Sequence, residues 1–151
     1  MPQEENNLIA TKLREYLMSV ISEINANYEQ INFNYLSKDV NNYSLDKIPV
    51  AKATESWIIG DIINRDVYSF RSRMNYSAEV ISNITNIGFF ETFEKTIKQN
   101  NEAGILPDIR GIESIKCLNC GTCTSTNSTT AEFDIQIEIR YREVESEEVS
   151  L

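Results

Sequence analysis

The sequence contains no histidine. This absence excludes Ser-His-Asp and Cys-His catalysis, zinc sites with imidazole ligands, and pH switches based on histidine. The only three cysteines lie between positions 117 and 123, so disulfides cannot connect distant parts of the chain. We therefore expect a protein that is made and folded in a reducing cytoplasm.

Long apolar runs are also missing. The longest, at Trp57-Ile58-Ile59, is followed by Gly60 and Asp61 and falls well short of the roughly 18 residues of a membrane span. The first residues lack the positive charge that opens a secretory signal, so no membrane or export role is expected. The chain also lacks the glycine-rich nucleotide loops and the G-x-S-x-G motif of hydrolases, and we do not expect an enzyme.

The chain has the length of a single domain and contains more acidic than basic residues. Its 151 residues include 14 Lys and Arg against 23 Asp and Glu, a net charge of −9. Such a charge repels phosphate backbones and disfavours nucleic-acid binding. We expect one domain over residues 1–142 and a flexible, acidic C-terminal tail over residues 143–151.

Hydrophobic periodicity in the first half predicts a helix followed by strands. The helix is expected over 8–24, with Asn6 or Asn7 as its N-cap. A half-buried strand is expected over 31–35, with Ile31, Phe33 and Tyr35 on one face, and a polar loop over 38–47. Strands over 50–59 and 62–74 are expected to form a hairpin, because Gly60-Asp61 suits a type II′ turn.

The second half predicts one more helix and two more strands. Ser77 is the expected cap of a helix that runs to Gln99, with a kink or break at Gly88, followed by a connector over 100–108. Strands are expected over 112–120 and 131–141. The order α-β-β-β-α-β-β favours an α+β domain with helices packed on one face of a mainly antiparallel sheet. The expected core includes Phe70, Tyr76, Phe89, Phe93, Ile135, Ile137 and Ile139.

One local motif invites a metal or redox interpretation. Cys117, Cys120 and Cys123 have the C-x₂-C-x₂-C spacing that opens a ferredoxin cluster run. The fourth position of that run is Asn127, and three cysteines cannot complete a tetrahedral site. The alternatives are ordinary packing of these residues on a hairpin, a metal shared between subunits, or a redox-sensitive pair of thiols. We expect no bound cofactor.

Charged residues form two stripes on expected strands. Arg65, Arg71 and Arg73 lie on one strand, and Glu132, Asp134 and Glu138 line the outer face of the last strand. The two stripes pair within one sheet, or the basic stripe meets the acidic stripe of a neighbouring subunit and orders a ring. Acid–base catalysis by the carboxylates needs a pocket, which nothing in the sequence indicates.

A resemblance to a phage family rests on residues 70–93. The run Phe70-Arg71-Ser72-Arg73, followed by Tyr76, Glu79-Val80, Asn83 and then Gly88-Phe89-Phe90-Glu91 with Phe93, is similar to minor capsid or tail terminator proteins of tailed bacteriophages. The expected hairpin and the final strand agree with that family, and the likeness spans about Ile48 to Arg142. The cysteine-bearing hairpin departs from the family pattern.

The resemblance implies a structural virion protein. Tail terminators form hexameric rings that cap the finished tail tube, stop its polymerisation and offer a surface to the neck. The implied partners are further copies of the chain, the major tail tube protein, the neck connector and, in contractile tails, the sheath, with DNA passing through unbound. The implied location is the junction of tail and neck in the virion, after synthesis in the host cytoplasm. A head-side connector or stopper and a headless, bacteriocin-like particle are the alternatives.

Overall fold

The computed structural model describes residues 2–24, 30–49, 53–56, 62–75, 80–119, 121–126 and 129–142. Within these ranges the chain forms two helices and seven strands. In chain order they are α1 (Pro2–Ile24), β1 (Gln30–Phe33), β2 (Asn42–Ile48), β3 (Ala53–Ser56), β4 (Ile62–Asn75), α2 (Val80–Ala103), β5 (Ile112–Cys117), β6 (Thr122–Thr126) and β7 (Thr130–Arg142).

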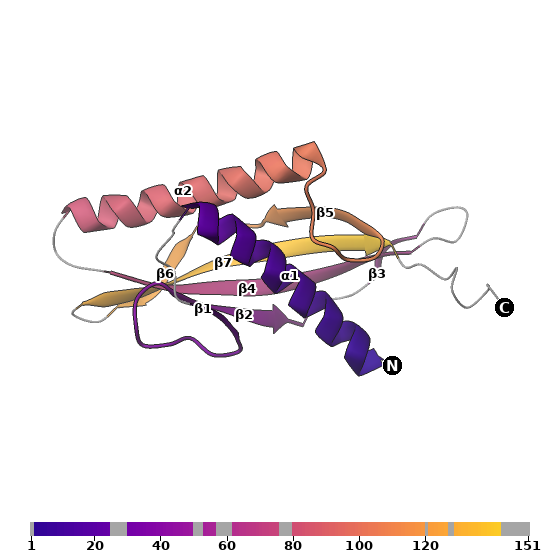
Figure 1. Cartoon of the computed structure of the whole chain (residues 1–151), viewed down its shortest axis with the longest axis horizontal. Helices are drawn as coiled ribbons and strands as arrows, with labels where there is room; N and C mark the ends of the chain where they lie inside the picture. The colour runs from indigo at the N-terminus through magenta and orange to yellow at the C-terminus, as the bar shows by residue number, and fades with distance from the viewer. Residues whose placement is uncertain are drawn as a thin grey trace.

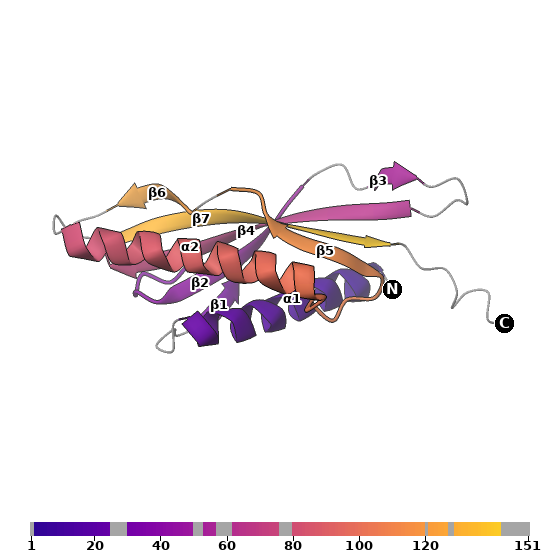
Figure 2. The same cartoon turned by 90° about the horizontal axis from the view of Figure 1, so that it is seen from above.

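The strands form one mixed sheet around the long antiparallel pair β4 and β7. Its order is β1-β2-β4-β7-β5; β3 continues the β2 side of β4, and β6 continues the β5 side of β7. The pair β1–β2 is parallel, and the other pairs are antiparallel. Both helices lie on one face of the sheet (Figures 1 and 2). The α+β class and the placement of the helices agree with the sequence prediction.

The core lies between the helices and the sheet. Leu13, Leu17 and Ile21 of α1 and Phe93 and Ile97 of α2 are completely buried there. The expected core residues Phe70, Phe93, Ile135, Ile137 and Ile139 are buried, and Phe89 is half-buried against them. Tyr76 lies outside the described residues. The alternation predicted for the last strand is therefore confirmed.

Helix α1 begins six residues earlier than predicted, at Pro2. Neither Asn6 nor Asn7 is its N-cap, because both lie inside the helix. Proline suits the first helical position, since its missing N–H would have no partner within the helix there. The polar start of the chain hides this extension, because it lacks the apolar period that marks the rest of the helix.

The loop predicted over 38–47 is wrong in its second half, because Asn42–Ile48 is strand β2. Tyr43 and Leu45 of this strand face the helices and are buried, whereas Ser44 and Asp46 face the other side. The period of two was present in the sequence, but the polar residues around it favoured a loop. Pairing with β4 provides the partners that a lone polar strand lacks. The preceding strand ends at Phe33, so Tyr35 lies beyond it and is 61% exposed.

The predicted pairing of two strands around Gly60-Asp61 is present, because β3 pairs antiparallel with the start of β4. The turn itself lies outside the described residues. Strand β4 ends within one residue of the expected position. Tyr68, Phe70, Ser72 and Met74 of this strand are buried on the helix side.

Helix α2 is continuous through Gly88, so of the predicted kink or break, the break is wrong. The glycine is exposed and a Cβ placed on it would meet nothing within 4 Å. Its penalty of about 1 kcal/mol is small beside the burial of Phe93 and Ile97 on the following turns. The helix ends later than predicted, at Ala103, and Gly104 follows in the left-handed conformation with φ of 78°. The Ser77 cap lies outside the described residues.

The predicted strand over 112–120 is shorter and is followed by an unpredicted strand. Strand β5 ends at Cys117, and β6 then pairs with the first half of β7. The observed order is therefore α-β-β-β-β-α-β-β-β, with two more strands than the sequence predicted. Strand β6 is exposed at every residue and carries no apolar alternation that would reveal it.

Candidate functional site

The sheet face opposite the helices carries the charged residues singled out in the sequence. We call this the open face; its central residues are Ser44 and Asp46 of β2, Arg65, Ser69, Arg71 and Arg73 of β4, Lys116 of β5, and Glu132, Asp134, Glu138 and Arg140 of β7. Neither α1 nor α2 covers it (Figure 2). All six predicted interface residues lie on this one face. They occupy alternate positions on β4 and β7, and the register of the two strands places these positions on the same side of the sheet.

One ion-pair network crosses three strands of the open face. Arg71 lies between Asp46 on β2 and Glu132 on β7, with N···O distances of 2.7 and 3.8 Å. The shorter contact has the length but not the angle of a hydrogen bond, so it is an ion pair. Arg73 also reaches Glu132, at 3.7 Å, and its Nε donates to the Ser37 carbonyl oxygen at 3.2 Å. The two arginines are therefore held from both sides.

A second cluster surrounds Glu138. The register places Arg65 directly opposite Arg140, a pairing of like charges that alone would be unfavourable. Glu138 lies between them: Arg65 donates to its Oε2 and Arg140 Nε to its Oε1, the latter at 3.2 Å. Lys116 Nζ lies 3.7 Å from the same carboxylate. One carboxylate therefore relieves the repulsion between two arginines.

The side chain of Glu138 is 3% exposed, although it lies on the outer face of the last strand. Burial alone raises the pKa of Glu138, but the hydrogen bonds from Arg65 and Arg140 outweigh burial and hold the pKa below its ordinary value. Glu138 is therefore charged at neutral pH. Three cationic side chains, those of Arg65, Lys116 and Arg140, lie against this carboxylate.

The remaining predicted carboxylate, Asp134, accepts a hydrogen bond from the Ser69 hydroxyl. Cross-strand pairing within the chain, one of the two alternatives from the sequence, is thus present for Arg65, Arg71 and Arg73. Sequence analysis missed Ser44, Asp46, Lys116 and Arg140 as members of the networks. The alternation Tyr43-Ser44-Leu45-Asp46 was the available signal for the first two.

The thiols show no metal site in the described part of the chain, where no cluster of three His, Cys, Asp or Glu could hold an ion. Cys117 is half-buried on β5 and packs against the core, and Cys123 of β6 is exposed. Cys120 lies outside the described residues. Of the three alternatives for the cysteines, ordinary packing agrees with the position of Cys117.

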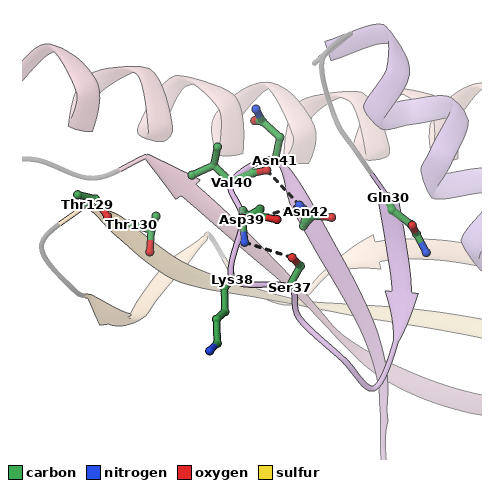
Figure 3. A pocket seen from close by; sticks show the side chains of 9 residues that line it. All are labelled: Gln30, Ser37, Lys38, Asp39, Val40, Asn41, Asn42, Thr129 and Thr130. Atoms are coloured by element: carbon green, nitrogen blue, oxygen red, sulfur yellow. Dashed lines mark hydrogen bonds between the residues drawn. The ribbon is translucent and has the colours of Figure 1, made fainter.

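A polar depression of about 680 Å³ lies beside the open face, between the loop before β2 and the start of β7 (Figure 3). Its loop is held by its own hydrogen bonds: Asn42 Nδ2 donates to the carbonyl oxygens of Asp39 and Val40, both at 3.1 Å. The other lining residues are Gln30, Ser37, Lys38, Asn41, Thr129 and Thr130. It combines one lysine with one aspartate and brings together no pair of groups arranged for proton transfer.

Comparison with known families and curated proteins gives no match: no protein-family model fits the chain, and no curated protein is significantly similar to it. Neither helix in the described ranges is long and apolar enough to cross a membrane. The open face therefore has to be interpreted from its own chemistry.

Proposed function

We propose that the chain is a structural virion assembly protein, the tail terminator of a tailed phage or a related particle. In this proposal six copies close into a ring that caps the tail tube, ends its polymerisation and presents a surface to the neck. The observation that carries the proposal is the open face, where charges of both signs are held in fixed positions on a sheet surface that neither helix covers. The resemblance over residues 70–93 supports the same function.

Fixed charges suit an assembly surface. Side chains that are already held by neighbours lose less conformational entropy when a partner binds. Arg71 lies between Asp46 of β2 and Glu132 of β7, and Arg73 also pairs with Glu132, so a neighbouring subunit can meet charges of either sign with the opposite charge. Such contacts fix the register between copies more than they add affinity, which is what a ring of defined size needs.

The proposed role needs no bond to be made or broken. The partners are further copies of the chain, the tube protein, the neck connector and the sheath of a contractile tail, and the location is the junction of tail and neck. DNA passes through the ring without being bound; the net charge of −9 lowers its adhesion to the wall.

The test compares two variants by native mass spectrometry and negative-stain microscopy. Arg71→Glu with Arg73→Glu places four acidic side chains together and should abolish rings. The matched control, Arg73→Glu with Glu132→Arg, keeps an ion pair inside the chain but reverses its direction. The proposal expects the control to fold like the wild type and still assemble poorly. A control that assembles normally would show that the charges act only within the fold.

A head-side connector or stopper is the second candidate, and partner binding separates the two. A terminator should cosediment with tubes of the major tail protein and should not bind empty heads that carry a portal. The reverse result would assign the chain to the head side.

A further inference from the structure

The path of paired strands ends at β1 on one side and at β5 on the other, and β3 and β6, which pair with β4 and β7, are further edge strands of the described sheet. An edge strand presents backbone N–H and C=O groups that can pair with another chain, and natural proteins usually cover or charge such edges. In this chain a side chain from each helix binds the edge nearest to it.

Arg14 of α1 binds the edge at β1. The amide of Asn34, just beyond β1, donates inward to the Leu45 carbonyl of β2. In a parallel strand, the backbone N–H and C=O groups of successive residues point to opposite sides of the strand. Those of Ile31 therefore point outward, away from β2. The Arg14 Nε donates to the Ile31 carbonyl oxygen at 2.7 Å, and the guanidinium carbon lies 5.9 Å from the ring centre of Phe33.

Asn101 of α2 binds the opposite edge. The amide of Leu118, which follows β5, donates inward to the Gln136 carbonyl oxygen of β7. The backbone N–H and C=O groups of the residues at odd-numbered positions of β5 therefore point outward, away from β7. Ile115 is one of these, and its amide donates to Asn101 Oδ1 at 2.9 Å. The two helices thus each bind one outward backbone group, Arg14 on β1 and Asn101 on β5.

The sequence at β1 makes this protection necessary. Residues 31–36, Ile-Asn-Phe-Asn-Tyr-Leu, contain no charge, no glycine and no proline. Six-residue segments of this kind, with high β-propensity and low charge, are those that pair with copies of themselves. Phe33 is 43% exposed and Tyr35 is 61% exposed, so the segment is not hidden in the core.

We propose that Arg14 and Asn101 prevent a second copy of this chain from adding a strand to the sheet at β1 or at β5. Copies of the chain then join through surfaces other than these two strands. This inference goes beyond the proposed function, because it holds whether the assembled form is a ring or the chain stays single.

Arg14→Ala tests the inference, and Lys12→Ala is its control, because Lys12 is a cation of the same helix that pairs with Glu15 and Asp108 instead of the edge. Sedimentation velocity measures self-association, and hydrogen exchange measures the amides of Ile31 and Phe33. We expect Arg14→Ala to raise the association constant about tenfold, the factor that corresponds to losing one hydrogen bond of a charged donor. In the associated species these amides should exchange more slowly than in the wild type, and Lys12→Ala should behave like the wild type.

A second variant separates edge protection from lost stability. Arg14→Ala with Phe33→Lys returns a charge to the edge without the hydrogen bond, and it should restore wild-type sedimentation. Asn101→Ala should likewise raise the association constant, and the Ile115 amide, which loses its bond to Asn101, should be protected only in the associated species. An Arg14→Ala protein that stays single, or that associates without protecting these amides, would overturn the inference.

The same exchange experiment on the wild type keeps this inference separate from the ring. Wild-type rings that protect the edge amides would refute edge blocking and leave the ring proposal standing. A wild type that never assembles, and whose Ile31 and Phe33 amides exchange freely, would refute the ring proposal and leave edge blocking standing.

Discussion

The ring of Phe90 occupies the space beside Gly121. A Cβ placed on Gly121 would lie 2.5 Å from Phe90 Cγ, which no side chain tolerates without movement. Phe90 is buried on α2 and packs at 4.9 Å between ring centres against Phe133 of β7. The segment between β5 and β6 can therefore cross beneath α2 only where a side chain is missing.

Gly121→Ala should lower the free energy of unfolding by about 1–3 kcal/mol, because the new methyl group overpacks the Phe90 site. Gly88→Ala is the matched control: the site is open, and alanine in a helix should stabilise by about 1 kcal/mol. Urea denaturation of both variants measures the contrast. Equal effects of the two substitutions would show that the contact with Phe90 does not constrain the chain.

Ile137→Ala should cost about 2–5 kcal/mol of unfolding free energy, because Ile137 is fully buried between the sheet and the helices. Gln136→Ala, on the open face of the same strand, should change it by less than about 0.5 kcal/mol. Denaturant midpoints of the two variants check the assignment of faces. A near-neutral Ile137→Ala would contradict it.

Glu138 should make stability depend on pH in the acid range. Its pKa is below the ordinary value of 4.5 in the folded chain, so its contribution is fully present above that value and is lost as the pH falls through the folded pKa. Glu138→Gln should be less stable than the wild type at neutral pH, since Arg65 and Arg140 lose their shared counter-ion. It should also lose part of the acid dependence.

Glu113→Gln is the control for that experiment, because Glu113 pairs with Arg142 at an exposed site, with side chains 41% and 45% exposed. Such a pair contributes little to stability. Denaturation curves collected across the acid range should therefore coincide for this variant and the wild type. A Glu138→Gln protein with an unchanged acid profile would refute the assigned role of Glu138.

Replacing all three cysteines by serine tests the metal and thiol alternative. We expect the variant to fold and assemble like the wild type, with a small loss of stability because Cys117 packs against the core. Elemental analysis of the wild-type protein should find no stoichiometric metal. Bound metal, or assembly that depends on the thiols, would favour the alternative.

The local sequence pattern was sufficient to predict a helix or strand where one face of that element is apolar over many residues. The alternation of residues 131–141 fixed strand β7 and its buried face, and the three- and four-residue spacing of Leu13, Leu17 and Ile21 fixed most of α1. The absence of histidine and of nucleotide loops likewise limited the chemistry before any fold was known. Each of these conclusions depends only on residues close together in the chain.

Tertiary structure alone decided the rest. Strands β2 and β6 exist because β4 and β7 offer them hydrogen-bonding edges, a condition that no short window of sequence contains. The same pairing places Glu138 between two arginines, 73 and 2 residues away in the sequence, and its side chain is buried on the outer face of the strand. The composition and periodicity of the sequence determine which side chains are apolar and lie on the buried face. The register of the sheet determines which charged side chains meet, because register depends on pairing between segments that are distant in the sequence.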